Sequence, residues 1–178
     1  ALGGYKTLPV ASDGASERLR EQISRKIREK HLLRAAGLAS ANGMSVLKIY
    51  MMVGLPGETL EDITELIALT KEQANICGPK TQVALGVAPF VAKRNTPLAG
   101  QPFAGIREVG RRLSLLRDGL KGFAEVRSVS ARWSYIEYIL AQGGQQTGLQ
   151  ALSAWRRGGT FADYSQAFSE DPRIALAG

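Results

Sequence analysis

The sequence predicts an α/β fold in which parallel strands alternate with helices and a helical region follows. Apolar runs rich in strand-forming residues recur up to Ser130, and stretches with helical periodicity lie between them. After Arg132 only helical patterns remain. Alternating strands and helices form parallel βα units with right-handed crossovers, which close into a barrel or stay an open sheet. We therefore expect an α/β region over 1–131 and a helical extension packed on its core over 132–178.

The first predicted unit begins with an extended apolar segment, Tyr5–Ala11, and passes through Ser12-Asp13-Gly14 into a helix. A spacing of four residues places three apolar side chains on one face of this helix; they are Leu19, Ile23 and Ile27. A second helix is expected from about Glu29 to Ala41, because the pair Asn42-Gly43 commonly ends helices.

The second unit carries the clearest local signals. Val46–Val53 is a nearly continuous apolar run, as expected for a strand that is covered on both faces. It ends in the turn Gly54–Glu58, after which Thr59 and Asp62 stand at the spacing of a capping box. A helix should therefore begin after Thr59, with its buried positions at Leu60, Ile63, Leu66, Ile67 and Thr70.

A further strand is predicted over Gln82–Phe90, and a proline-containing loop leads from it to a helix between Ile106 and Leu120. A short strand is expected over Glu125–Ser130. The C-terminal extension then shows three short helical patterns separated by glycine pairs, at 133–141, 147–156 and 161–168.

The composition is that of a folded soluble protein, with 44% hydrophobic and 22% charged residues among 178. The longest apolar run is far shorter than the roughly 18 residues that cross a bilayer, and Ala1–Gly4 lacks a signal-peptide pattern. We expect a cytoplasmic protein without membrane contact. The net charge of +7 could attract nucleic acid or an anionic cofactor, but the basic residues of 17–34 interleave with acidic ones, which is typical of a solvated helix surface.

The single cysteine, Cys77, excludes an internal disulfide and a multi-cysteine metal site within this chain. A half-buried structural thiol near a helix end is its simplest interpretation. The only histidine, His31, lies in a predicted helix, which favours a surface position over a catalytic triad or a metal site. Phosphate-binding loops, dinucleotide-binding fingerprints and nucleophile elbows are absent from the sequence.

Ligands of parallel α/β folds bind at the carboxyl ends of the strands. The candidate ligand-binding loops are therefore 11–16, 54–59 and 89–96. In the first loop Asp13 could hold a pair of ribose hydroxyls beside Ser12 and Ser16, or Asp13 or Ser16 could simply cap a helix.

In the second loop, two glycines let the backbone approach a planar ligand and Glu58 could accept hydrogen bonds from it, or the segment is a structural turn. In the third, Pro89-Phe90 meets Lys93, Arg94 and Asn95, which could receive an acidic group or form a solvated basic loop.

Three segments together resemble the radical S-adenosylmethionine superfamily, and within it the group that often carries an N-terminal cobalamin-binding domain. Thr7–Arg20, with Ala15-Ser16-Glu17-Arg18-Leu19-Arg20, is similar to the fourth barrel strand and the start of its helix. Lys48–Thr59 resembles the fifth strand with its Gly-Leu-Pro-x-Glu-Thr turn, and Pro89–Pro97 resembles the sixth. Ser12 and Asp13 stand where this group usually has proline and glutamate.

The resemblance implies the C-terminal part of a (β/α) TIM-type barrel, here partial. It also implies a 4Fe-4S cluster and S-adenosylmethionine, which is cleaved to methionine and a 5′-deoxyadenosyl radical, and in part of the group cobalamin. Carried over to this sequence, Asp13 and Ser16 would hold the ribose or methionine portion. The strand ends that would border the adenine are Val53, Gly54 and Leu55, together with Pro89 and Phe90. No catalytic residue or metal ligand is assigned within this chain.

The family's Cys-x3-Cys-x2-Cys loop follows the first barrel strand, upstream of the residues present here. We therefore expect a fragment of an Fe-S oxidoreductase that is inactive alone and has the N-terminal remainder of the same polypeptide as its partner. Unpaired strand edges would favour self-association of the fragment. The alternative is a complete, non-catalytic α/β module that binds a nucleotide or RNA. The substrate is not indicated, because superfamily members share the core and differ in loops and added domains.

Overall fold

The computed structural model describes residues 3–169, which belong to two compact units. The first unit comprises Ala1–Ala88 with Arg111–Ser128, and the second comprises Pro89–Gly110 with Val129–Gly178. The loop after the third strand thus belongs with the C-terminal helices. Residues 170–178 of the predicted extension lie outside the described part of the chain.

The first unit contains a four-stranded parallel sheet, which confirms the predicted α/β class. Its strands are β1 (Thr7–Asp13), β2 (Val46–Val53), β3 (Gln82–Pro89) and β4 (Ala124–Ser128), and they lie side by side in chain order. Strand β1 pairs with β2 from Thr7 opposite Val46 to Ala11 opposite Tyr50, and the register shifts before Asp13. Within the described residues the sheet is not closed into a barrel.

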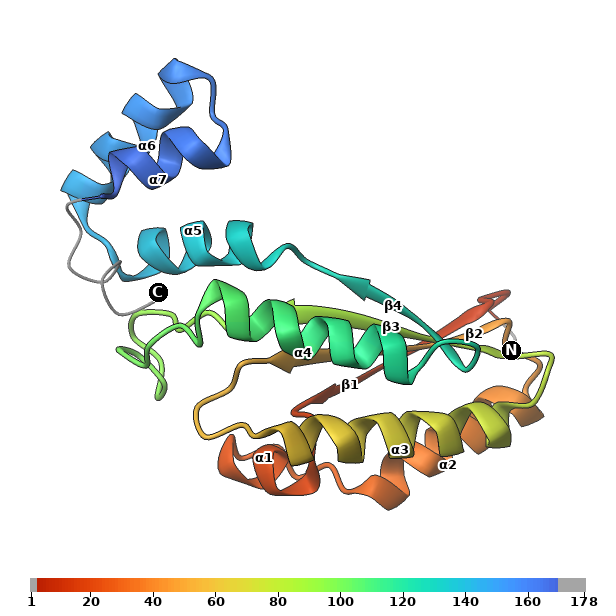
Figure 1. Ribbon diagram of the computed structural model, residues 1–178. Coiled ribbons are helices and arrows are strands. Elements are labelled where there is room, and N and C mark those ends of the chain that lie inside the picture. Colours follow the sequence, from red (N-terminus) through yellow and green to blue (C-terminus); the bar gives the residue numbers. More distant parts are fainter. Residues whose placement is uncertain (1–2, 170–178) are drawn as a thin grey trace. The chain divides into compact units, whose positions relative to one another are not determined.

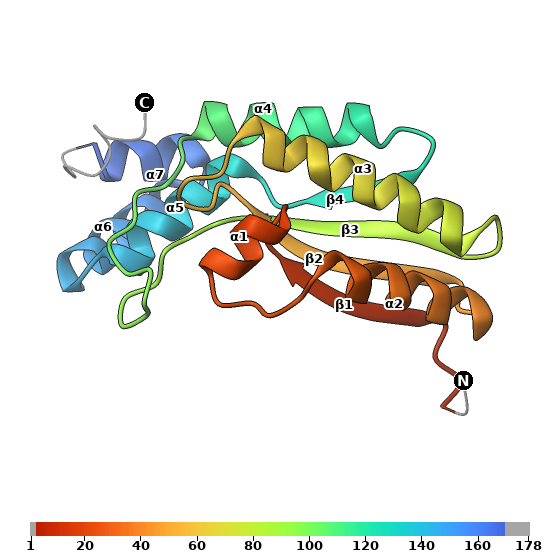
Figure 2. The ribbon, with the colours of Figure 1, turned by 90° about the horizontal axis from the view of Figure 1, so that it is seen from below.

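Helices cover one face of this sheet (Figures 1 and 2). They are α1 (Glu17–Gln22), α2 (Glu29–Ala41), α3 (Leu60–Cys77) and the part of α4 (Ile106–Gly119) that belongs to this unit. The core lies between the two layers and includes Leu47, Ile49, Met51 and Val53 of β2, which are at most 3% exposed.

Within the described residues, helices cover only one face of β2, whereas its apolar run predicts cover on both faces. Its alternate residues Val46, Lys48, Tyr50 and Met52 lie on the helix-free face, where Tyr50 is 45% exposed. Tyr50 packs over the backbone of β3, because a Cβ atom at Gly86 would lie 3.0 Å from its ring. Within this unit the strand is therefore half-covered, which sequence hydrophobicity alone did not indicate.

The first predicted helix is shorter than its apolar spacing suggested. Helix α1 ends at Gln22, Ser24 takes a left-handed conformation (φ 59°), and Ile23 and Ile27 are only partly buried. The cause is Arg20, whose buried guanidinium donates hydrogen bonds to the carbonyls of Ile27 (2.8 Å) and Gly14 (3.2 Å). These bonds draw the segment after α1 back toward the end of β1, so the helix cannot continue.

The second unit consists of the loop from Pro89, the start of α4, and the helices α5 (Ala131–Gln142), α6 (Gln145–Arg157) and α7 (Phe161–Ala167). Three short helices were predicted here, and their positions are confirmed. The ring of Phe103 lies 5.7 Å from that of Tyr135 and 5.9 Å from that of Tyr138, which attaches the loop to α5. Among residues 3–169, no helix combines the length and the apolar character needed to cross a membrane.

Candidate functional site

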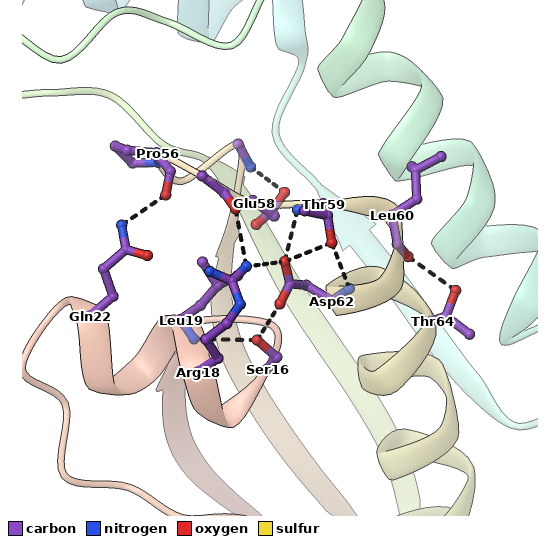
Figure 3. A network of polar contacts seen from close by, with 12 residues as sticks. Ser16, Arg18, Leu19, Gln22, Pro56, Glu58, Thr59, Leu60, Asp62 and Thr64 are labelled. Carbon is purple, nitrogen blue, oxygen red and sulfur yellow. Dashed lines mark hydrogen bonds and ion pairs between the residues drawn. The ribbon is translucent and has the colours of Figure 1, made fainter.

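The carboxyl ends of β1 and β2 lie at one edge of the sheet, because the strands are parallel and adjacent. Asp13 is the last residue of β1, and Val53 is the last residue of β2. The turns that follow bring the predicted residues Ser16 and Glu58 to this edge, each at the start of a helix. Figure 3 shows the polar contacts that join the two turns.

Ser16 is the N-cap of α1, which confirms the capping alternative for this residue. Its hydroxyl accepts a hydrogen bond from the backbone N–H of Leu19 (3.2 Å) and donates one to Oδ1 of Asp62 (2.5 Å). Ser16 is only 2% exposed. Its hydroxyl therefore connects the first turn of α1 to the first turn of α3 (Figure 3).

Asp62 is the centre of this connection. Besides Ser16, its carboxylate accepts hydrogen bonds from the guanidinium of Arg18 (2.6 Å) and from the N–H of Thr59 (2.7 Å). The predicted capping box of α3 is thus present and has two further partners from α1. Burial by itself raises the pKa of Asp62, but the hydrogen bonds from Ser16, Thr59 and Arg18 outweigh it and hold the pKa below its ordinary value.

The turn between β2 and α3 is held by Glu58. Gly54 and Gly57 adopt left-handed conformations (φ 84° and 72°), which other residues take up only with strain. Oε1 of Glu58 accepts hydrogen bonds from the N–H of Gly54 (2.7 Å) and from the guanidinium of Arg112 on α4 (2.9 Å). Arg112 also donates to the backbone carbonyl of Glu58 (3.1 Å). Glu58 therefore connects its own turn to α4.

The Glu58 side chain is fully buried. Its other oxygen, Oε2, has no hydrogen-bond partner among residues 3–169. Burial raises the pKa of Glu58, although the bonds from Gly54 and Arg112 act against it. Val53 and Leu55, on either side of Gly54, are also buried. The side chains of Val53, Leu55 and Glu58 thus form the buried interior of the turn that follows β2.

Asp13 differs from the other predicted residues of this edge, because its side chain remains 29% exposed. Its backbone is left-handed (φ 61°), and its carboxylate forms an ion pair with Arg25 from the loop after α1. The buried Arg20 holds that loop in place. Asp13 does not cap α1, so among the predicted residues of this edge it is the one whose side chain remains at the surface, paired with Arg25.

The third candidate ligand-binding loop, 89–96, belongs to the second unit. Pro89 ends β3, and the ring of Phe90 is 7% exposed. Lys93 forms an ion pair with Glu137 of α5, and Arg94 donates a hydrogen bond to the carbonyl of Gly143 (2.9 Å). These cations hold the loop against α5 and its C-terminal end.

Within residues 3–169, no three His, Cys, Asp or Glu side chains come together in a way that could hold a metal ion. His31 is exposed, and its Nδ1 accepts a hydrogen bond from the N–H of Arg28 at the start of α2 (3.1 Å). This surface position agrees with the interpretation of the sequence. Cys77 is the last residue of α3 and is buried more completely than its sequence position suggested, at 2% exposure.

The Cys77 thiol should be unreactive in the folded protein, because burial both blocks access and raises its pKa. Labelling with a thiol-specific disulfide reagent at mildly alkaline pH is expected to be about 100-fold slower in buffer than in denaturing urea. The urea sample is the internal control for reagent activity. Equal rates in the two samples would show that this end of α3 opens readily.

Comparison with known proteins identifies a relative but no family. An uncharacterized protein of Methanocaldococcus jannaschii is 42% identical to the chain over 98 residues. The match covers 55% of this chain and 21% of the relative, so it spans about a fifth of that protein's length. No family model matches the chain, and no solved structure matches it.

Proposed function

We propose that this chain is part of the barrel of a radical S-adenosylmethionine enzyme, and that the edge formed by the ends of β1 and β2 contributes to its S-adenosylmethionine pocket. The observation that carries the proposal is the position of the first two family-like segments. The first runs along β1 into α1, the second runs along β2 to the N-cap of α3, and the two strands are adjacent and parallel. The match to a much longer relative is compatible with a larger parent protein.

The helix-free face of the sheet supports a barrel. In (β/α) barrels the strands follow one another in chain order, helices cover the outside, and the inner face packs against the remaining strands. Here the strands are in chain order, and the face without helices carries Lys48, Tyr50, Glu125 and Arg127 around a hollow of about 420 Å³. We propose that this face is the inner wall of the barrel.

The residues present fit S-adenosylmethionine in part. Asp13 offers carboxylate oxygens to ribose hydroxyls, whereas Gly54 is buried and its N–H is bonded to Glu58. Ser16, Val53, Leu55 and Glu58 are buried and would act by holding the two turns in place. When bound and cleaved, S-adenosylmethionine supplies an organic radical that abstracts hydrogen from a substrate.

The residues present do not fit the 4Fe-4S cluster, because one buried cysteine cannot provide its ligands. We derive no step through the cluster, and we assign no residue to cobalamin. Under this proposal the cluster ligands come from other residues of the parent polypeptide. The isolated chain would then be inactive, with that remainder as its partner.

The test uses the complete product of the gene that encodes this chain, purified without oxygen and reconstituted with iron and sulfide. Under reducing conditions we expect it to form 5′-deoxyadenosine from S-adenosylmethionine. Asp13→Ala should raise KM for S-adenosylmethionine about tenfold or more, as expected when a charged hydrogen-bond acceptor is lost.

Asp118→Ala is the matched control, because Asp118 is an exposed carboxylate near the C-terminal end of α4, at the opposite edge of the sheet. Its KM should be unchanged. Absence of a three-cysteine loop from the complete gene product, or cleavage activity in the 178-residue chain alone, would contradict the proposal.

A further inference from the structure

An exposed aromatic ring lies at the end of the sheet where the strands begin. This is opposite the carboxyl-terminal ends of the strands described above. Phe123 lies in the turn between α4 and β4 and is 44% exposed. Gly122 gives this turn its left-handed conformation (φ 83°), and the N–H of Phe123 bonds to the carbonyl of Leu120 (2.9 Å). The ammonium group of Lys71 on α3 lies 5.0 Å from the ring centroid. The turn therefore presents the ring at the surface beside a cation.

The turn that carries Phe123 lies on the same side of the unit as the C-terminal end of α3 and the loop before β3 (Figure 2). Two hollows adjoin the ring, with volumes of about 570 Å³ and 360 Å³, and both are lined by Gln82, Gly122 and Phe123. One ring is thus shared by two neighbouring recesses.

The surface of the larger hollow is mostly polar, and no carboxylate lines it. Asn75 and Gln82 are exposed, and their side-chain amides have no hydrogen-bond partner within residues 3–169. Lys80 and Lys121 are exposed and form no ion pair in that part of the chain. The carboxylate of Glu125, which borders the smaller hollow, is neutralised by Arg127 at 2.7 Å and 2.8 Å.

We propose that this surface, formed by Phe123 with Lys71, Lys80, Asn75 and Gln82, binds single-stranded nucleic acid. Aromatic rings stack on bases of any kind, and lysines attract the phosphate backbone. Side-chain amides both donate and accept hydrogen bonds, as the edges of unpaired bases require.

An acidic peptide fits this surface less well than a nucleic acid. It would pair with the lysines but would leave the Phe123 ring and the side-chain amides of Asn75 and Gln82 without a partner. A free nucleotide would occupy only one recess. The net charge of +7 also favours a nucleic acid as the ligand, because it strengthens attraction to a polyanion. The proposal is independent of the function proposed above, since the two surfaces lie at opposite edges of the sheet.

The test measures fluorescence anisotropy of labelled oligoribonucleotides and oligodeoxyribonucleotides of about 12 nucleotides, a length that a small binding domain covers. We expect the 178-residue chain to bind at least one of the two kinds, with an affinity that falls as salt is added. Phe123→Ala should weaken binding about tenfold, as expected for loss of one stacking platform. Phe123→Leu should weaken it similarly while retaining an apolar side chain in the turn.

Charge reversal tests the lysines with a matched control. Lys80→Glu should weaken binding about fivefold or more, because it replaces attraction of phosphate by repulsion. Lys30→Glu changes the net charge equally on an exposed residue at the start of α2, toward the opposite edge of the sheet, and should have a smaller effect.

Four results would overturn the proposal: no binding by the unaltered chain, unchanged binding by both Phe123 variants, an equal loss in Lys30→Glu, or binding of adenosine monophosphate as tight as that of the oligonucleotides. Circular dichroism of each variant confirms that it is folded.

Discussion

Replacing Arg112 by alanine is expected to lower the free energy of unfolding by about 3–5 kcal/mol, the usual cost of removing one partner of a buried ion pair. The side chain of Arg112 is 10% exposed and that of Glu58 is fully buried. Without Arg112, the Glu58 carboxylate would keep only the hydrogen bond from Gly54 that its Oε1 accepts. Urea unfolding followed by circular dichroism measures the loss.

The size of this loss should depend on pH. Burial raises the pKa of Glu58 in the folded state, so folding favours the protonated carboxyl. The stability that Glu58 contributes is therefore fully present below the ordinary glutamate pKa. It decreases as the pH rises through the raised pKa of the folded state. A neutral Glu58 needs no counter-ion. The destabilisation by Arg112→Ala should therefore be larger near neutral pH than at about pH 4.

Two variants serve as controls for this prediction. Arg107→Ala removes an exposed arginine from the same helix and should cost less than about 0.5 kcal/mol. Glu58→Gln combined with Arg112→Met replaces the pair by uncharged side chains and should cost less than Arg112→Ala alone, because no buried charge remains. A pH-independent loss in Arg112→Ala would contradict the role assigned to Glu58.

Asp62→Ala is expected to destabilise the protein by about 3 kcal/mol, because several hydrogen bonds to one buried carboxylate are lost together. The pKa of Asp62 is lowered in the folded state. Its stabilisation is therefore fully present above the ordinary aspartate pKa and is lost as pH falls through the lowered value. Unfolding curves collected from neutral to acidic pH should show the gap between Asp62→Ala and the unaltered protein narrowing toward acid.

Glu61→Ala is the matched control for Asp62, since Glu61 is an exposed carboxylate in the same helical turn. Its effect should stay below about 0.5 kcal/mol. A double-mutant cycle of Ser16→Ala with Asp62→Ala should give a coupling of about 1 kcal/mol or more, as is usual for residues in one hydrogen-bond network. Additive effects would show that the two turns are not energetically linked.

The local features of the site were predictable because each depends on neighbouring residues. Thr59 and Asp62 are three residues apart, which is the spacing of a capping box, and the helix begins where that box places it. The glycines at positions 54 and 57 indicated a sharp turn, and both have positive φ values. The parallel α/β class followed in the same way from the order of strand and helix patterns.

The partners of the buried polar groups were not predictable. Arg112 contacts Glu58 across 54 positions of sequence, and Ser16 contacts Asp62 across 46. Arg20 was expected on a solvated helix surface but is 1% exposed, because its guanidinium finds carbonyl acceptors in Gly14, Ala15 and Ile27. Burial of a charged group depends on acceptors that the folded chain brings to it, and residue type does not reveal them.

The strands, the capping box and the tight turn between β2 and α3 were thus determined by the sequence itself, because short-range sterics and hydrogen bonds within a few residues specify them. Only the tertiary structure decided that Ser16 and Glu58 are enclosed while Asp13 remains at the surface. Exposure of a strand-end residue is set by which distant side chains pack against it, and that packing exists only after the sheet and its helices have assembled.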